Sequence, residues 1–215
     1  MSCKSGFSRT MRTHQLPPPS RLSPCAAQRG FTLIELAVVA VIVTVIAVVA
    51  VPRARNFIID ARAEPGANDM MKAVSAIRAS RQGAGTTAYS NVSIAELGTI
   101  LRQTGSYVVT PATGTPTSVT HKIASGQGTP WVAISPENMG GIGTGDSFNV
   151  VFHQVDMAAC VRFTQILAAG AIFASVRPLA GSSPAVIVKN VGAEYVGSLA
   201  QTACDGPTEL RFVFR

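Results

Sequence analysis

One uninterrupted apolar segment dominates the hydrophobic pattern of the chain. It runs from Phe31 to Val51 as FTLIELAVVAVIVTVIAVVAV, and Glu35 is its only charged residue. A segment that is apolar on all sides is not the pattern of an amphipathic surface helix. Its 21 residues are enough to cross a bilayer as an α-helix, which lipid favours because the backbone must satisfy its own hydrogen bonds. We therefore predict a membrane-spanning helix, in which the glutamate requires an explanation.

An amphipathic helical pattern follows the apolar segment. Pro52 comes directly after it and is expected to kink or interrupt the helix. Apolar residues then recur at roughly helical spacing, and Pro65-Gly66 marks a second break. We predict a helix over residues 54–82, in one or two pieces. Residues 31–82 together would form an N-terminal helical region with kinks near residues 52 and 65.

Residues 83–215 have the pattern of a globular head. Ser93 and Glu96 form an S-x-x-E capping box before a short helix predicted at 94–103. Beyond it, short runs rich in β-branched and aromatic residues predict strands, and one longer apolar segment predicts a helix. The predicted strands are KIASG (122–126) or WVAIS (131–135), then 148–155, 171–178, 185–190 and 209–215, and the helix is 156–170. This order predicts an α+β fold, with an antiparallel sheet packed against helix.

Positive charge is concentrated before the apolar segment. Residues 1–30 carry five Lys or Arg and no acid, whereas residues 31–215 carry 13 bases and 11 acids. The basic flank is expected to stay in the cytoplasm, and its polar, proline-bearing composition predicts disorder. The folded part lacks the basic excess of a nucleic-acid-binding domain, so we expect the chain to bind no nucleic acid.

The segment RGFTLIEL, residues 29–36, resembles the N-terminal signature of type IV prepilins and of the related type II secretion pseudopilins. A basic leader ends in Gly30, Phe31 follows, Glu35 is fifth after that point and Pro52 is twenty-second. The resemblance implies that a prepilin peptidase cuts between Gly30 and Phe31, removing the leader of residues 1–30, and then methylates the new amine of Phe31. An assembly ATPase and a platform protein would next move the subunit from the inner membrane into a helical fibre of pilin copies.

Glu35 has a physical interpretation of its own. A carboxylate in a membrane segment is costly unless it is paired, which makes it a functional candidate. It lies one helical turn from the amine that cleavage would create at Phe31, near the positive end of the helix dipole. In the family, this glutamate is thought to meet the terminal amine of a neighbouring subunit. Low dielectric would strengthen such a pair, and the pair would set the register of the fibre.

Four cysteines are divided between the two ends of the chain. Cys3 and Cys25 lie in the leader, Cys160 and Cys204 lie in the head, and neither pair has metal-site or redox C-x-x-C spacing. The head cysteines would be a disulfide pair in an exported domain, or two free buried thiols otherwise. The C-terminal half resembles type IVb pilins, which bridge a helix cysteine to one near the C-terminus, implying Cys160–Cys204. The long leader also favours type IVb, whereas Phe31 is usual in type IVa pilins and pseudopilins.

We interpret the chain as a structural pilus subunit, not as an enzyme. The histidines are scattered, no catalytic triad stands out, and we expect neither a metal nor a cofactor. The fibre would lie on the surface of a Gram-negative-type bacterium and serve adhesion, conjugation, aggregation or motility. The alternatives are a type II secretion pseudopilin, a minor pilin, and a membrane-anchored periplasmic enzyme or binding protein. A secretory signal cut after Ala50 is a further alternative.

Overall fold

The computed structural model describes residues 31–124, 126, 128–139, 145–181 and 183–215. The leader predicted at residues 1–30 lies outside this range. The chain divides into two compact units, Met1–Thr44 and Val45–Arg215.

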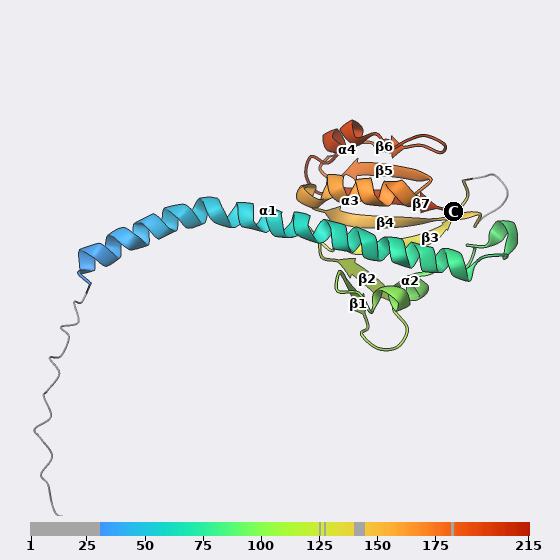
Figure 1. Ribbon diagram of the computed structural model, residues 1–215, viewed down its shortest axis with the longest axis horizontal. Helices are drawn as coiled ribbons and strands as arrows, with labels where there is room; N and C mark the ends of the chain where they lie inside the picture. Colours follow the sequence, from blue (N-terminus) through green and yellow to red (C-terminus); the bar gives the residue numbers. More distant parts are fainter. Residues whose placement is uncertain (1–30, 125, 127, 140–144, 182) are drawn as a thin grey trace, which may run out of the picture. The chain divides into compact units, whose positions relative to one another are not determined.

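Helix α1 is the longest element of the structure and runs from Leu33 to Ser80 (Figure 1). Its apolar part contains an 18-residue window with a mean hydropathy of 3.0, and none of that window is buried. By length and composition, this helix can cross a membrane. The long apolar helix that the sequence predicted is therefore present.

Pro65 lies inside α1, although the sequence predicted a break at Pro65-Gly66. A proline inside a helix removes one backbone hydrogen bond and crowds the preceding turn, which costs about 3 kcal/mol. Here the hydroxyl of Tyr107 donates to the Gly66 carbonyl oxygen at 2.8 Å, and the adjacent Ala67 is fully buried. Packing outweighs the local signal and the helix is continuous, so the predicted break is wrong, whereas a kink near residue 65 stays a prediction. The helix also continues through Pro52, and a bend there stays a prediction.

The C-terminal half of α1 belongs to the core of the head. Its buried side chains recur every three or four residues, which is the spacing of one helix face. They are Ile59, Ala63, Ala67, Met70, Ala73, Val74 and Ile77. The compact unit that begins at Val45 includes this stripe. A boundary at residue 82, as the sequence suggested, would separate the stripe from the core that it completes.

In the described residues of the head, the strands form a seven-stranded antiparallel sheet in the order β1-β2-β3-β4-β7-β5-β6 (Figure 1). The strands are β1 (Tyr107–Thr110), β2 (Ser118–His121), β3 (Trp131–Glu137), β4 (Ser147–Val155), β5 (Phe173–Pro178), β6 (Val186–Lys189) and β7 (Thr208–Phe214). The last strand, β7, lies between β4 and β5 and pairs with both. The predicted α+β fold is confirmed.

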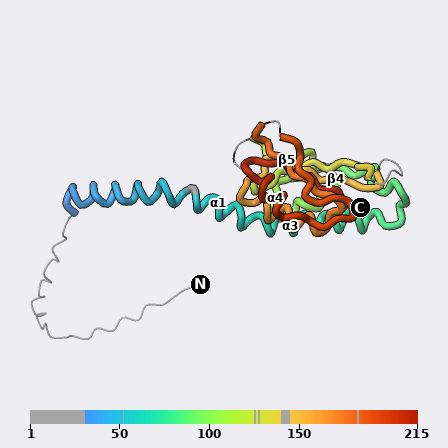
Figure 2. Tube along the Cα trace, turned by 90° about the horizontal axis from the view of Figure 1, so that it is seen from above, coloured from blue at the N-terminus to red at the C-terminus, as the bar shows by residue number. Residues whose placement is uncertain are grey.

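The part of the head that the structure describes also contains the helices α2 (Ile94–Leu101), α3 (Met157–Gly170) and α4 (Gly197–Ala203). A short 3₁₀ helix, η1, spans Gly85–Thr87. Helices α1 and α3 lie side by side along the same face of the sheet (Figures 1 and 2). The guanidinium of Arg78 on α1 donates to the carbonyl oxygen of Gly170, at the end of α3, at 3.1 Å.

The core between helices and sheet is aromatic. Phe152 of β4 meets Phe163 of α3 edge to face, with ring centroids 4.8 Å apart. On β7, the predicted alternation is confirmed on one face, where Leu210, Phe212 and Phe214 are fully buried. Such aromatic pairs contribute about 0.5–1.5 kcal/mol beyond the area that they bury.

Candidate functional site

Thr32 directly precedes α1, and its side chain binds the backbone of Glu35. Its hydroxyl accepts a hydrogen bond from the Glu35 backbone N–H at 3.2 Å, and its carbonyl accepts one from Leu36 at 3.1 Å. The hydroxyl thereby satisfies one of the N–H groups that every helix start leaves without an intrahelical partner. The sequence reasoning missed Thr32, although T-x-x-E at residues 32–35 is a readable capping signal.

The carboxylate of Glu35 stands in the first turn of α1, next to exposed apolar side chains. Phe31 is 82% exposed and Leu33 is 88% exposed. Among the residues that the structure describes, no Lys or Arg pairs with this carboxylate. Gly30 lies outside the described residues. Within the described chain, the Glu35 carboxylate therefore has no basic partner, and the apolar side chains around it are uncovered.

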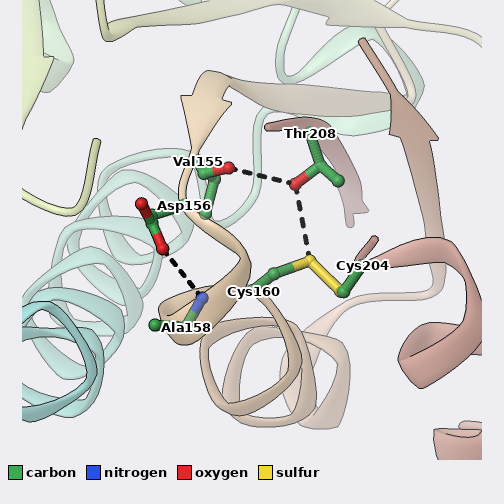
Figure 3. Close-up of a disulfide and its surroundings, with 6 residues drawn as sticks. All are labelled: Val155, Asp156, Ala158, Cys160, Cys204 and Thr208. Atoms are coloured by element: carbon green, nitrogen blue, oxygen red, sulfur yellow. Dashed lines mark hydrogen bonds between the residues drawn. A yellow bond between two sulfur atoms is a disulfide. The ribbon is translucent and has the colours of Figure 1, made fainter. Parts of the chain in front are cut away.

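A disulfide joins Cys160 of α3 to Cys204 at the end of α4, with the two Cα atoms 5.8 Å apart (Figure 3). This is the pairing that the resemblance implied. Asp156 caps α3 by accepting from the Ala158 backbone N–H at 2.9 Å, and thereby fixes the turn that carries Cys160. The Thr208 hydroxyl lies 3.4 Å from the Cys160 sulfur. The bridge thus connects two helices beside the start of β7.

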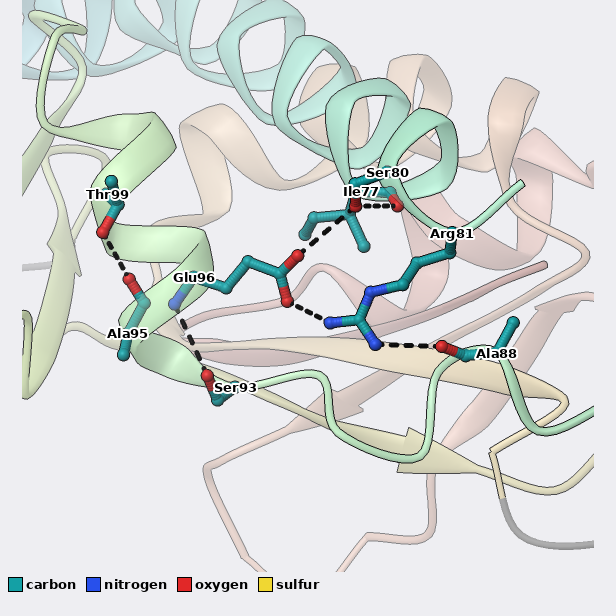
Figure 4. A network of polar contacts seen from close by, with 8 residues as sticks. All are labelled: Ile77, Ser80, Arg81, Ala88, Ser93, Ala95, Glu96 and Thr99. Atoms are coloured by element: carbon teal, nitrogen blue, oxygen red, sulfur yellow. Dashed lines mark hydrogen bonds and ion pairs between the residues drawn. The ribbon is translucent and has the colours of Figure 1, made fainter. Parts of the chain in front are cut away.

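A polar network ties the C-terminal end of α1 to α2 (Figure 4). Ser93 caps α2 as predicted, because its hydroxyl accepts from the Glu96 backbone N–H at 3.5 Å. The Glu96 carboxylate turns to Arg81 instead of back to its own helix, and the ion pair measures 2.5 Å. Arg81 also donates to the Ala88 carbonyl oxygen at 2.9 Å. Of the predicted capping box, the Ser93 cap is formed, whereas the Glu96 side chain forms an ion pair with Arg81.

Burial shifts the pKa values of His121 in β2 and Tyr107 in β1. It lowers the pKa of His121 from 6.5 to about 4, and the ring nitrogen Nε2 lies 2.8 Å from the His153 carbonyl oxygen. The neutral ring therefore carries its proton on Nε2 and donates it to that carbonyl. Burial, with a smaller effect of the Asp69 charge, raises the pKa of Tyr107 well above 10.0. Both rings act as neutral parts of the packing.

The described residues contain no group of three or more His, Cys, Asp or Glu side chains that could hold a metal ion. Of the sequence-predicted site residues, the structure brings together Cys160 and Cys204. Phe31, Glu35 and Pro52 are distributed along α1 or just before it.

A family model described as the prokaryotic N-terminal methylation motif matches residues 25–51. In this segment the chain is similar to proteins that carry the motif. A solved crystal structure of a type IVb pilin from Salmonella typhi is similar, with a TM-score of 0.45 and 15% identity. The match covers 70% of this chain and 95% of that one. No curated protein matches.

Proposed function

We propose that this pilin-like protein is the structural subunit of a type IV pilus, of the type IVb kind. In this proposal, prepilin peptidase cuts after Gly30 and methylates Phe31. The subunit waits in the inner membrane, and an assembly ATPase and platform protein add it to a helical fibre outside a Gram-negative-type cell. The methylation motif at residues 25–51 is the observation that carries the proposal.

The register of the motif on α1 supports a role for Glu35 in assembly. Cleavage at Gly30 would leave Phe31 as the residue directly before the Thr32 cap, so the new amine would stand at the start of the helix. A carboxylate without a partner in that turn is costly in an apolar environment. The amine of an incoming copy would neutralise it. Because apolar side chains alone slide easily past one another, this pair would define the axial register.

The exposed first half of α1 supports a role as fibre core. Its apolar side chains from Phe31 to Val51 are largely exposed. An apolar patch of this size is unfavourable in water and marks a surface that contacts lipid or protein. Lipid covers them in the precursor, and the helices of other copies would cover them in a fibre. Val and Ile dominate this segment, so its helix depends on an apolar environment more than on intrinsic propensity.

Mass spectrometry of the protein purified from its cell envelope tests the processing. We expect an N-terminus at Phe31 that is heavier by one methyl group. An intact residue 1 would overturn the processing and with it the pilin proposal.

Glu35→Val tests the assembly pair. The variant should insert into the membrane in normal amounts but yield no sheared fibres. Thr44→Val is the matched control, because in the described structure the Thr44 hydroxyl donates back to the Ala40 carbonyl of the same helix, at 2.7 Å. Normal fibres from Glu35→Val would contradict the pairing.

A type II secretion pseudopilin is the second candidate, and Phe31 as first residue favours it. The two candidates differ in where the polymer lies. A pilus subunit should be recovered in fibres sheared from the cell surface, whereas a pseudopilin should stay with the cell envelope.

A further inference from the structure

A groove in the head lies at the point where the apolar segment ends. Its volume is about 420 Å³, and its apolar lining comes from Val51, Ala54, Ile58, Ile59 and Ala124. Three cationic side chains, Arg55, Arg62 and Lys122, complete it, and no carboxylate lines it. We propose that this groove binds the phosphate headgroup of an anionic phospholipid, with the apolar lining against the glycerol and upper acyl chain.

The charges on this part of α1 are segregated by face. Arg55 and Arg62 are seven residues apart, two helical turns, and share the face that lines the groove. The acids Asp60 and Glu64 lie about half a turn away. Glu64 forms an ion pair with Arg162 of α3, whose pKa is raised by Glu64 and to a smaller extent by Asp60. The acids are thus directed to α3, and their charge does not neutralise the groove.

Arg62 and Lys122 keep donors available for an anion. Both side chains are exposed, and within the described ranges neither forms an ion pair. Lys122 donates to the Gly105 carbonyl oxygen at 2.6 Å, which uses one of its three N–H groups and leaves its charge uncompensated. A guanidinium and an ammonium facing one space are the usual protein ligands of phosphate.

The position of the groove at the end of the apolar segment favours a lipid over a free anion as its ligand. Val51 is the last residue of the apolar segment and also part of the groove. From Val51 to Arg62 the helix rises about 16 Å. The headgroup layer beyond the hydrocarbon is about 5–7 Å thick, so Val51, Ala54 and Arg55 lie at its level, and the long side chain of Arg62 faces it from the aqueous side. An anionic phosphate fits the donors of Arg62 and Lys122, whereas the choline of a zwitterionic lipid would be repelled.

This inference rests on the membrane insertion contained in the proposed function, but it requires neither cleavage nor assembly. The test uses the full chain in micelles of an uncharged detergent, titrated with dioctanoyl-phosphatidylglycerol in a calorimeter. Dioctanoyl-phosphatidylcholine and inorganic phosphate are the comparison probes. We expect the anionic lipid to bind more tightly than either probe, and its affinity to fall as salt is added.

Variants connect the binding to the groove. Arg62→Gln and Lys122→Gln should each weaken binding of the anionic lipid about fivefold, and the double variant about 25-fold. Arg215→Gln, an exposed arginine outside the groove, should leave the affinity unchanged. Because both groove residues are exposed, the folded head should keep its circular dichroism spectrum.

Three results would overturn the proposal. The first is equal affinity for the anionic and zwitterionic lipids, and the second is wild-type affinity in the double variant. The third is inorganic phosphate binding as tightly as the anionic lipid, which would assign the groove to a free anion. None of them affects the processing experiment on Phe31, so failure here and failure of the pilin proposal are distinguishable.

Discussion

Removal of the disulfide should destabilise the head strongly. Cys160 and Cys204 enclose a sequence separation of 44 residues, and this loop contains β5, β6 and α4. Strand β6 is one of the two edges of the sheet and, in the described part of the chain, pairs with β5, so the cross-link anchors this edge of the head.

The size of the effect follows from the loop length. In the chain-entropy model, a cross-link that closes 44 residues stabilises the folded state by about 4 kcal/mol at 25 °C. For a folded unit of this size, each kcal/mol changes the melting temperature by about 2–4 °C. Reduction should therefore lower the melting temperature of the head by about 8–16 °C.

Trp131 provides the assay. It is the only tryptophan of the chain and lies in β3, so its fluorescence reports unfolding of the head alone. Thermal unfolding is followed in detergent with and without a reducing agent. Cys3 and Cys25 are replaced by serine in the background, which leaves one disulfide to reduce. Cys204→Ser should melt like the reduced protein and should not respond to the reducing agent.

The reasoning fails if reduction lowers the melting temperature by less than about 3 °C, since the entropy model requires several times that. It also fails if Cys204→Ser retains the stability of the oxidised protein. Either result would mean that packing alone holds α4 and the sheet edge.

Two further predictions concern the head. Arg81→Ala should lower the free energy of unfolding by about 1–3 kcal/mol in urea titrations, because it leaves the half-buried Glu96 carboxylate without its ion pair. The control is Arg162→Ala, which should change the free energy of unfolding little because both partners of the Arg162–Glu64 pair are exposed. Equal losses in the two variants would contradict this prediction. Because burial lowers the pKa of His121 to about 4, the unfolded chain binds a proton more readily, so stability should fall as the pH falls from about 6.5 to about 4. The loss should reach about 3 kcal/mol relative to His121→Gln, and parallel pH profiles of the two proteins would refute it.

The elements with strong local signals were predicted well. Helix α3 follows an Asp cap and carries a regular apolar stripe, and β7 alternates Leu210, Phe212 and Phe214 with other residues. Both lie within two residues of their predicted bounds. In these segments, the local pattern and the tertiary packing favour the same structure.

The missed elements depend on partners that are distant in sequence. Strands β1 and β2 lie in a segment rich in Gly, Thr and Pro, and they exist because β2 pairs with β3, for example Val119 with Val132. Helix α4 is short, and its start at Val196 has no side-chain cap. Propensity is a weak guide for such elements, because ladder bonds and core contacts decide their structure.

The candidate sites divide in the same way. Glu35 was predicted from sequence, and Thr32 was missed although the cap and its acid are only three residues apart. The pairing of Cys160 with Cys204 followed from the resemblance. The groove was not predictable, since Arg62 and Lys122 are 60 positions apart and meet only when α1 packs on the sheet.

The two halves of helix α1 differ in what stabilises them. Its C-terminal half buries one stripe in the head, where core contacts, a disulfide-linked α3 and the link from Arg81 to Glu96 support it. Its N-terminal half has no such support within the described chain, and it combines β-branched residues with one carboxylate. Such a segment is stable in lipid or among copies of itself, and the acid penalises every arrangement that leaves it unpaired. In the proposed fibre, Glu35 would therefore distinguish between arrangements that the apolar side chains around it cannot distinguish.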